Sequence, residues 1–241
     1  MTIETRPLAY RHDDMDFEAL LVSEAGAPPR PAVILFPTIM GRSDLELGFA
    51  RKLAEIGYAA IVADLYGVAN IGRSREECRG LMNALRADRP RLRARLMKVL
   101  ETVRGQTEVD AGMIAAIGYC FGGLCALDLA RTGADVRGVA SFHGLFAPPG
   151  NLDGTPIRAK VIAFHGWDDP MVTPADVEAL GRELSEAGAD WQIHAYGGTM
   201  HGFTNPAANA PESGLAYNEV AEARSWRSLE AFLEECFAPQ R

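Results

Sequence analysis

The stretch GYCFGG, residues 118 to 123, decides the fold. It follows an apolar run that predicts a strand at residues 113–117 and precedes a pattern that predicts a helix at residues 123–131. A chain that turns from strand to helix within so few residues needs positions without side chains two before and two after the turning residue, and Gly118 and Gly122 meet this need. The context is typical of a nucleophile elbow in which cysteine takes the place of the usual serine.

Cys120 is the candidate nucleophile of this elbow. Its thiol would lie at the N-terminus of the following helix, whose partial positive charge favours the thiolate over the reference pKa of about 8.5. The alternative is a packed core cysteine whose neighbouring glycines only let the helix approach the sheet. The other cysteines, Cys78, Cys125 and Cys236, form no CxxC pair and no cluster at metal-ligand spacing, so we expect small buried groups in a reducing compartment.

Strands and helices alternate along the chain. Parallel strands need crossover connections, which are usually helices, so the alternation predicts the α/β class, with a mostly parallel sheet flanked by helices on both faces. Functional groups of such sheets gather at the carboxyl ends of the strands. Strands are expected at residues 3–10, 17–22, 32–36, 59–63, 113–117, 136–142, 160–165 and 191–196, and helices at 45–56, 76–103 with an interruption near Pro90, 123–131, 174–187 and 217–236.

An acid and a histidine follow the elbow in the chain order nucleophile, acid, histidine. Asp169 lies in the loop after the strand at 160–165, and His201 lies in the loop after the strand at 191–196. His201 would take the Cys120 proton and return one to the leaving group, while the carboxylate fixes the tautomer of the imidazole. Asp169 is favoured over Asp168 because one of two adjacent acids usually caps its own turn. The alternative for His201 is a surface loop histidine.

An oxyanion hole needs two backbone N–H groups. We expect Phe121, which follows the nucleophile, to supply one of them, and Ile39, in the loop after the strand at 32–36, to supply the other. The apolar loop that holds Ile39 could equally pack between sheet and helix.

With these residues in view, the chain resembles the dienelactone hydrolase family, also called carboxymethylenebutenolidases, of the α/β-hydrolase superfamily. The resemblance rests on GYCFGG at 118–123, on Asp169 three residues before Val172, on HGF at 201–203, and on the segment from GYA at 57–59 through DLY at 64–66. It implies the α/β-hydrolase fold, a Cys120, Asp169 and His201 triad, and Thr38 and Ile39 beside the nucleophile. Together with the length of 241 residues, it predicts a single α/β-hydrolase domain over residues 1–241.

Two positions depart from the family pattern. Thr38 stands where the dienelactone-cleaving prototypes have a glutamate that engages the resting cysteine, and Asn205 stands where they have a substrate-binding arginine. The substrate itself therefore stays open. The residues expected to bind it are Thr38, Met40, Trp167, Phe203 and Asn205, and the arginines that could hold a substrate carboxylate are Arg73, Arg75 and Arg79.

Charge and composition limit the classes of molecule that the protein could bind. The chain has 24 Lys and Arg against 32 Asp and Glu, and a net charge of −8 would repel nucleic acid. The locally basic residues 86–95 are interpreted as a solvated helix face. No apolar run reaches the roughly 20 residues of a membrane span, and no basic and then apolar leader is present, so we expect a cytoplasmic protein without membrane contact.

The leading hypothesis is a cysteine hydrolase of small esters or lactones that works through an acyl-thioenzyme and needs no cofactor. A thioesterase or acyl transferase could use the same triad, and a non-catalytic member could bind a small carbonyl ligand. The expected partner is a small-molecule ester or lactone, and the oligomeric state is left open.

Overall fold

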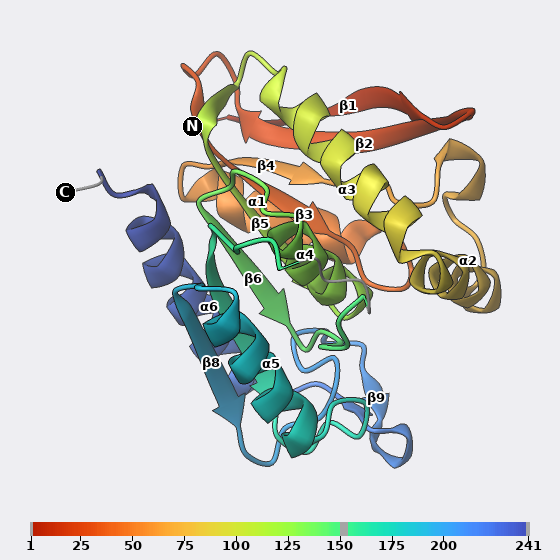
Figure 1. Ribbon diagram of the computed structural model, residues 1–241. Helices are drawn as coiled ribbons and strands as arrows, with labels where there is room; N and C mark the ends of the chain where they lie inside the picture. The colour runs from red at the N-terminus through yellow and green to blue at the C-terminus, as the bar shows by residue number, and fades with distance from the viewer. Residues whose placement is uncertain (1, 150–153, 240–241) are drawn as a thin grey trace. The chain divides into compact units, whose positions relative to one another are not determined.

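The computed structural model describes residues 2–149 and 154–239, and the chain divides into two compact units, Met1–Ile117 and Gly118–Arg241 (Figure 1). The units are described in turn. That they form one domain stays a prediction.

The first unit is built on five strands in the order β1-β2-β4-β3-β5. Strands β1 and β2 form an antiparallel hairpin, and Asp13 in its turn has a φ of 46°. Strand β2 pairs antiparallel with β4, and β4 pairs parallel with β3. The final two residues of β5, Gly118 and Tyr119, belong to the second unit. The strands are β1 (Ile3–His12), β2 (Met15–Glu24), β3 (Arg30–Phe36), β4 (Ala59–Val62) and β5 (Val109–Tyr119).

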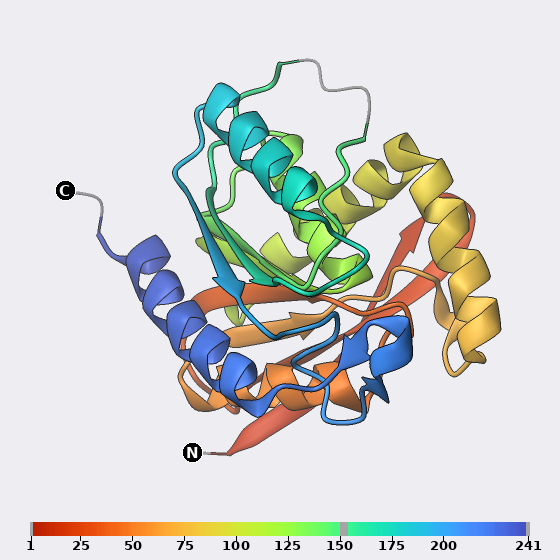
Figure 2. The same cartoon turned by 90° about the horizontal axis from the view of Figure 1, so that it is seen from below.

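Helices cover both faces of these strands, with α1 on one face and α3 on the other (Figures 1 and 2). The expected interruption near Pro90 is confirmed, and it divides the long helical region into α2 and α3. Asp88 serves both helices. Its backbone N–H donates to Ala84 of α2, and its side chain accepts the N–H of Arg91 in α3. The helices are α1 (Asp44–Glu55), α2 (Arg75–Ala87) and α3 (Arg89–Arg104), with a 3₁₀ turn, η1, at Val68–Asn70.

The interpretation of residues 86–95 as a solvated face is wrong for Arg89, which is buried, and most clearly for Arg95. This side chain is 3% exposed, its Nη1 donates to the Leu65 carbonyl at 2.6 Å, and its guanidinium lies 4.7 Å from the centre of the Phe17 ring. A buried charge needs compensating contacts. The Leu65 carbonyl supplies a hydrogen bond and the Phe17 ring a cation–π contact, and helical periodicity reveals neither of them.

The second unit is built on the parallel strands β6, β7 and β8. Helices α5 and α6 lie on opposite faces of these strands (Figure 2). Every residue of α4 is buried, which agrees with its apolar sequence. The elements are α4 (Phe121–Arg131), β6 (Gly138–Phe142), β7 (Lys160–Gly166), α5 (Pro174–Glu186), β8 (Trp191–Tyr196), β9 (Asn209–Ala210), η2 (Pro211–Ser213), β10 (Leu215–Ala216) and α6 (Glu219–Phe237).

All of the expected strands and helices are present, and most ends agree within a few residues. The small hairpin of β9 and β10 was not expected from the sequence, because its strands of two residues each are too short to show a period. This hairpin contacts the backbone of His201. Within the described part of the chain, no helix is both long and apolar enough to cross a membrane.

Candidate active site

Cys120 occupies a strained turn between β5 and α4. Its φ of 57° and ψ of −114° lie in a backbone region that residues other than glycine rarely adopt. The strain is held by hydrogen bonds, because the Cys120 N–H donates to the Phe142 carbonyl at 3.0 Å and its carbonyl accepts the N–H of Gly123 at 3.0 Å. Cys120 is half-buried, whereas the other three cysteines are buried, as expected.

The glycines of the elbow are required by close backbone contact. A Cβ on Gly118 would lie 1.9 Å from the Gly122 carbonyl oxygen, a distance that no backbone adjustment of a few tenths of an ångström could relieve. On the far side of the turn, a Cβ on Gly123 would lie 2.7 Å from the Cα of Gly144, in the segment that follows β6. Gly118 and Gly123, at the two ends of the GYCFGG stretch, therefore each lie too close to neighbouring backbone for a side chain.

His201 is held against Asp169. Its Nδ1 lies 2.7 Å from Asp169 Oδ2, and both side chains are almost completely buried. The backbone of His201 is fixed by the hairpin, since its N–H donates to Gly214 and its carbonyl accepts the N–H of Ala216. The position of His201 beside Asp169 is therefore set by backbone hydrogen bonds.

Asp169, and not Asp168, is the carboxylate that contacts His201. Asp169 is 3% exposed, and its second oxygen, Oδ1, accepts the N–H of Met171 at 2.8 Å. Asp168 is exposed, and its backbone N–H donates to the Thr199 carbonyl. The capping argument used in the sequence analysis therefore applies to Asp169 itself, which caps its own turn with one oxygen and holds His201 with the other.

The electrostatics of His201 favour the protonated ring. Burial lowers its pKa, but the hydrogen bond to Asp169, the Cys120 thiol beside the ring and the charges of both groups outweigh burial and raise the pKa to about 10. Cys120, His201 and Asp169 thus act on one another electrostatically within the second unit.

Two further histidines lie near this group and are neutral. Burial lowers the pKa of His143 well below its ordinary value, and the neighbouring His201 lowers it further. Burial also lowers the pKa of His165, although Asp169 opposes this effect. The sequence pattern predicted no role for His143, yet its ring lies 5.1 Å from that of His201. Its position directly after β6, at a carboxyl end, was the available signal.

The loop with Thr38, Ile39 and Met40 belongs to the first unit. The Thr38 N–H donates to Oε1 of Glu46 at 3.0 Å, and the Ile39 carbonyl accepts the Tyr66 hydroxyl at 3.0 Å. Glu46 is completely buried and also accepts the hydroxyl of Ser43. No role for Glu46 was expected from the sequence, although the spacing Ser43-x-x-Glu46 is that of a capping box.

The remaining expected substrate-binding residues differ in exposure. Met40 is 37% exposed and Trp167 is 46% exposed, so both present apolar surface. Phe203 is completely buried, and its ring lies 5.1 Å from that of His143. Asn205 turns toward its own loop, where Oδ1 accepts the N–H of Ala207 at 3.0 Å. That these residues contact a substrate stays a prediction. That the N–H groups of Ile39 and of Phe121, the first residue of α4, form an oxyanion hole also stays a prediction.

The three arginines considered for a substrate carboxylate are exposed in the first unit. Arg73 is paired with Glu77 at 3.1 Å and also donates to the Ala69 carbonyl at 3.3 Å. Arg75 and Arg79 lie on α2. Whether any of them meets a substrate stays a prediction.

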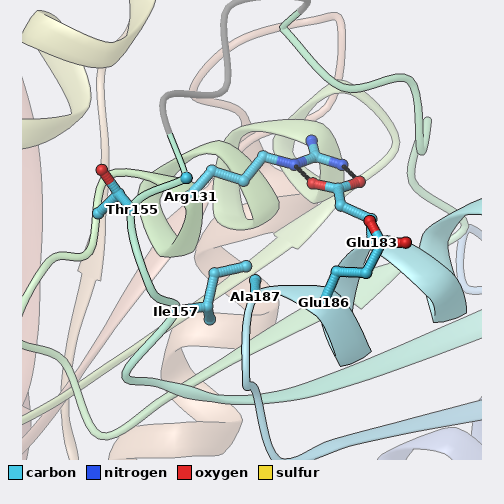
Figure 3. Close-up of a pocket in the computed structure, with 7 residues that line it drawn as sticks. Arg131, Thr155, Ile157, Glu183, Glu186 and Ala187 are labelled. Atoms are coloured by element: carbon cyan, nitrogen blue, oxygen red, sulfur yellow. Dashed lines mark hydrogen bonds and ion pairs between the residues drawn. The ribbon is translucent and has the colours of Figure 1, made fainter.

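A separate pocket of about 220 Å³ lies in the second unit and contains none of the triad residues (Figure 3). Arg131, the positively charged residue that lines this pocket, points toward Glu183 and donates hydrogen bonds to its carboxylate from Nε and Nη2, at 2.6 Å and 2.8 Å. Nη1 of the same guanidinium donates to Asp128. Because the charge is already neutralised, we assign no function to this pocket.

Comparison with known proteins places this geometry in a family. Residues 17–237 match the dienelactone hydrolase family. The solved structure m3DLH is 37% identical, with a TM-score of 0.92 over 98% of this chain and 99% of its own. A dienelactone hydrolase-like promiscuous phosphotriesterase, P91, from metagenomic libraries is 34% identical, with a TM-score of 0.91 over 98% of this chain and 99% of its own.

A more distant structure shows the fold class. MGS-M1, an α/β-hydrolase enzyme from a deep-sea metagenome library of the Medee basin, is 17% identical, with a TM-score of 0.68 over 98% of both chains. The expected fold class and the family resemblance are thereby confirmed. The chain belongs to the dienelactone hydrolase family, a family of ester-bond hydrolases with the α/β-hydrolase fold.

Proposed function

We propose that the protein hydrolyses small, uncharged carboxylic esters and lactones through an acyl-thioenzyme on Cys120. The observation that supports this most is the buried hydrogen bond between His201 and Asp169, together with the effect of Cys120 on the pKa of His201. A cysteine at a strained elbow, a histidine and a carboxylate are the parts that nucleophilic acyl transfer needs.

In the proposed reaction, Nδ1 of His201 is engaged by Asp169, so Nε2 exchanges the proton with Cys120. The thiolate attacks the carbonyl carbon, the carbonyl becomes an oxyanion, and the N–H groups of Phe121 and Ile39 stabilise it. The carbon–oxygen bond then breaks, and the imidazolium gives its proton to the leaving alkoxide. In the second half, His201 takes a proton from water as the water oxygen attacks the thioester carbonyl, and the same two N–H groups stabilise the second oxyanion. The carbon–sulfur bond then breaks, the carboxylic acid leaves, and His201 returns the proton to the Cys120 sulfur.

The preference for an uncharged substrate follows from the surroundings. A buried carboxylate without a cationic partner costs several kcal/mol. Asn205 is engaged by its own loop and Arg73 by Glu77, so neither offers a ready partner. The exposed apolar side chains Met40 and Trp167 suit a neutral acyl group better.

A second candidate substrate class is the phosphotriester. It is favoured by the similarity to P91, which is described as a promiscuous phosphotriesterase and is aligned over 98% of this chain. A phosphotriester is uncharged, as the preference above requires, and Cys120 would attack phosphorus in place of carbon. Thioesterase or acyl-transferase activity would use the same sulfur with another acyl donor or acceptor.

The test is a substrate panel run on wild-type protein, Cys120→Ala and Cys125→Ala. The panel contains 4-nitrophenyl acetate, a simple lactone, a dienelactone, a thioester and a dialkyl aryl phosphate. We expect turnover of neutral esters, a loss of roughly a thousandfold or more in Cys120→Ala, and activity within about threefold of wild type in Cys125→Ala. Cys125 is the matched control because it is a buried cysteine of α4, the helix that Cys120 precedes, and no step of the reaction uses it.

Mass spectrometry of the quenched wild-type enzyme should show one added acyl group, absent from Cys120→Ala. If Cys120→Ala kept a tenth of the wild-type rate, the nucleophile assignment would be wrong. A dienelactone kcat/KM well above that for neutral esters would contradict the proposed substrate class. No turnover of any substrate would favour a non-catalytic binding protein.

A further inference from the structure

His143 stands out among the residues that the proposed reaction does not use. It follows β6 directly and has a φ of 37°, in the left-handed region that residues with a side chain rarely adopt. Its N–H donates to the Phe164 carbonyl at 2.8 Å. The next residue, Gly144, is packed so closely that a Cβ on it would lie 2.9 Å from the Cα of Gly123. The backbone is therefore fixed on both sides of His143.

The ring of His143 is equally well defined. It is 2% exposed, and its Nε2 lies 2.8 Å from the hydroxyl of Thr204, which is itself buried. The ring centre lies 5.1 Å from that of His201, and the two planes meet at 64°. Nδ1 is buried and has no hydrogen-bond partner on another residue. A strained backbone is costly, and such strain is typical of functional sites.

The charges around the two rings differ. Asp169 and Cys120 raise the pKa of His201, whereas burial and the nearby His201 lower the pKa of His143. Burial lowers the pKa of His165, and the nearby His201 lowers it further, while Asp169 opposes both effects. His201 therefore has one carboxylate and one thiol acting on it, and it lies near two rings whose pKa values are lowered. Of the two rings, His143 is the one that contacts His201, in an edge-to-face arrangement.

We propose that His143 is a positioning residue: anchored by Thr204, its ring packs edge to face on His201 and keeps the Nε2 of His201 directed at Cys120. This inference rests on the proposed function, because it concerns the same triad. A ring packed 5.1 Å away leaves the His201 imidazole little room to turn, because close packing fixes side-chain orientation. Without this ring, His201 would still bond to Asp169 but could turn about that bond. The Cys120 thiolate would then lose a fixed cation.

The experiment measures the rate of Cys120 alkylation by iodoacetamide as a function of pH, with the modified peptide identified by mass spectrometry. The rate follows the thiolate population and requires no turnover. In His143→Leu the midpoint should rise by about one pH unit toward the reference value of about 8.5. Thr204→Val, which keeps the shape and removes the hydroxyl, should shift it in the same direction by less.

His194→Leu is the matched control. His194 lies on β8, and its ring contacts Phe164 rather than His201. The same substitution there should leave the alkylation midpoint unchanged. The kcat for 4-nitrophenyl acetate should fall about tenfold in His143→Leu with KM nearly constant, because positioning of the base affects the chemical step.

A His143→Leu protein that is folded by circular dichroism and keeps the wild-type midpoint and kcat would overturn the inference. A lower melting temperature with an unchanged midpoint would also overturn it, since the role would then be structural only. If His143→Leu does not fold, Thr204→Val decides the matter by the same two readouts. A shifted midpoint in a protein whose wild type cleaves no ester would refute the proposed function and leave the positioning role intact.

Discussion

Replacing Asp169 with asparagine is the sharpest test of the triad, because it changes charge and leaves size. Asp169 Oδ1 accepts the N–H of Met171 at 2.8 Å, a bond that requires an oxygen. In the variant, the amide oxygen stays there and the NH₂ group faces His201 in place of Oδ2. That group donates, so Nδ1 of His201 must accept, and its single proton moves to Nε2. The ring could then not take the proton of Cys120.

The magnitude follows from the pKa of His201. The net rise from 6.5 to about 10 corresponds to about 5 kcal/mol at 1.36 kcal/mol per pKa unit, which is what Asp169 and Cys120 contribute together after burial has opposed them. If Asp169 supplies half, its removal costs about 2.5 kcal/mol, or nearly a hundredfold. The wrong tautomer adds to this loss, so kcat should fall by a factor of roughly 10² to 10⁴.

The assay is the steady-state hydrolysis of 4-nitrophenyl acetate between pH 6 and pH 9. Asp168→Asn is the control, because the Asp168 side chain is exposed and its contact with Thr199 is made by the backbone. It should stay within about twofold of wild type. An Asp169→Asn enzyme with more than a tenth of the wild-type kcat would refute the reasoning, as would an equal loss in Asp168→Asn.

Two further predictions concern stability. Gly118→Ala should lower the free energy of unfolding by several kcal/mol, because its Cβ would lie 1.9 Å from the Gly122 carbonyl oxygen. Gly48→Ala, in an open helical position, should raise it by about 0.5–1 kcal/mol. Urea denaturation would measure both changes, and a Gly118→Ala protein as stable as wild type would contradict the described elbow. The pKa of His201 is about 10 in the folded protein and about 6.5 in the unfolded chain, so its stabilising protonation is complete below pH 6.5 and is lost as the pH rises toward 10. Wild type should therefore lose stability across that window more steeply than His201→Gln, and equal slopes would speak against the raised pKa.

The sequence predicted most of the site because its signals are local. The elbow needs Gly118 and Gly122 at fixed offsets from Cys120, and the chain order of acid and histidine is a property of the fold. The contact of Asp169 with His201 was expected for an incomplete reason. Capping and holding the histidine were treated as alternatives for two residues, but one carboxylate has two oxygens and does both.

What the sequence did not predict depends on tertiary contact. His143 is a strand-end histidine until the loop with Thr204 folds over it. Arg95 reads as an exposed basic residue until the Leu65 carbonyl and the Phe17 ring enclose it. In both cases the partner lies 30 or more residues away, and hydrophobic periodicity carries no information about such partners.

The double use of Asp88 also affects which changes of chain length the first unit can accept. This one residue ends α2 with its backbone N–H and begins α3 with its side chain and its carbonyl, which accepts the N–H of Leu92. There is no spacer between the two helices in which an added or deleted residue could be absorbed. An insertion there would leave one helix without its terminal partner, whereas an insertion in the exposed β1–β2 turn would disturb no such shared cap. Length variation among homologues should therefore avoid the α2–α3 joint.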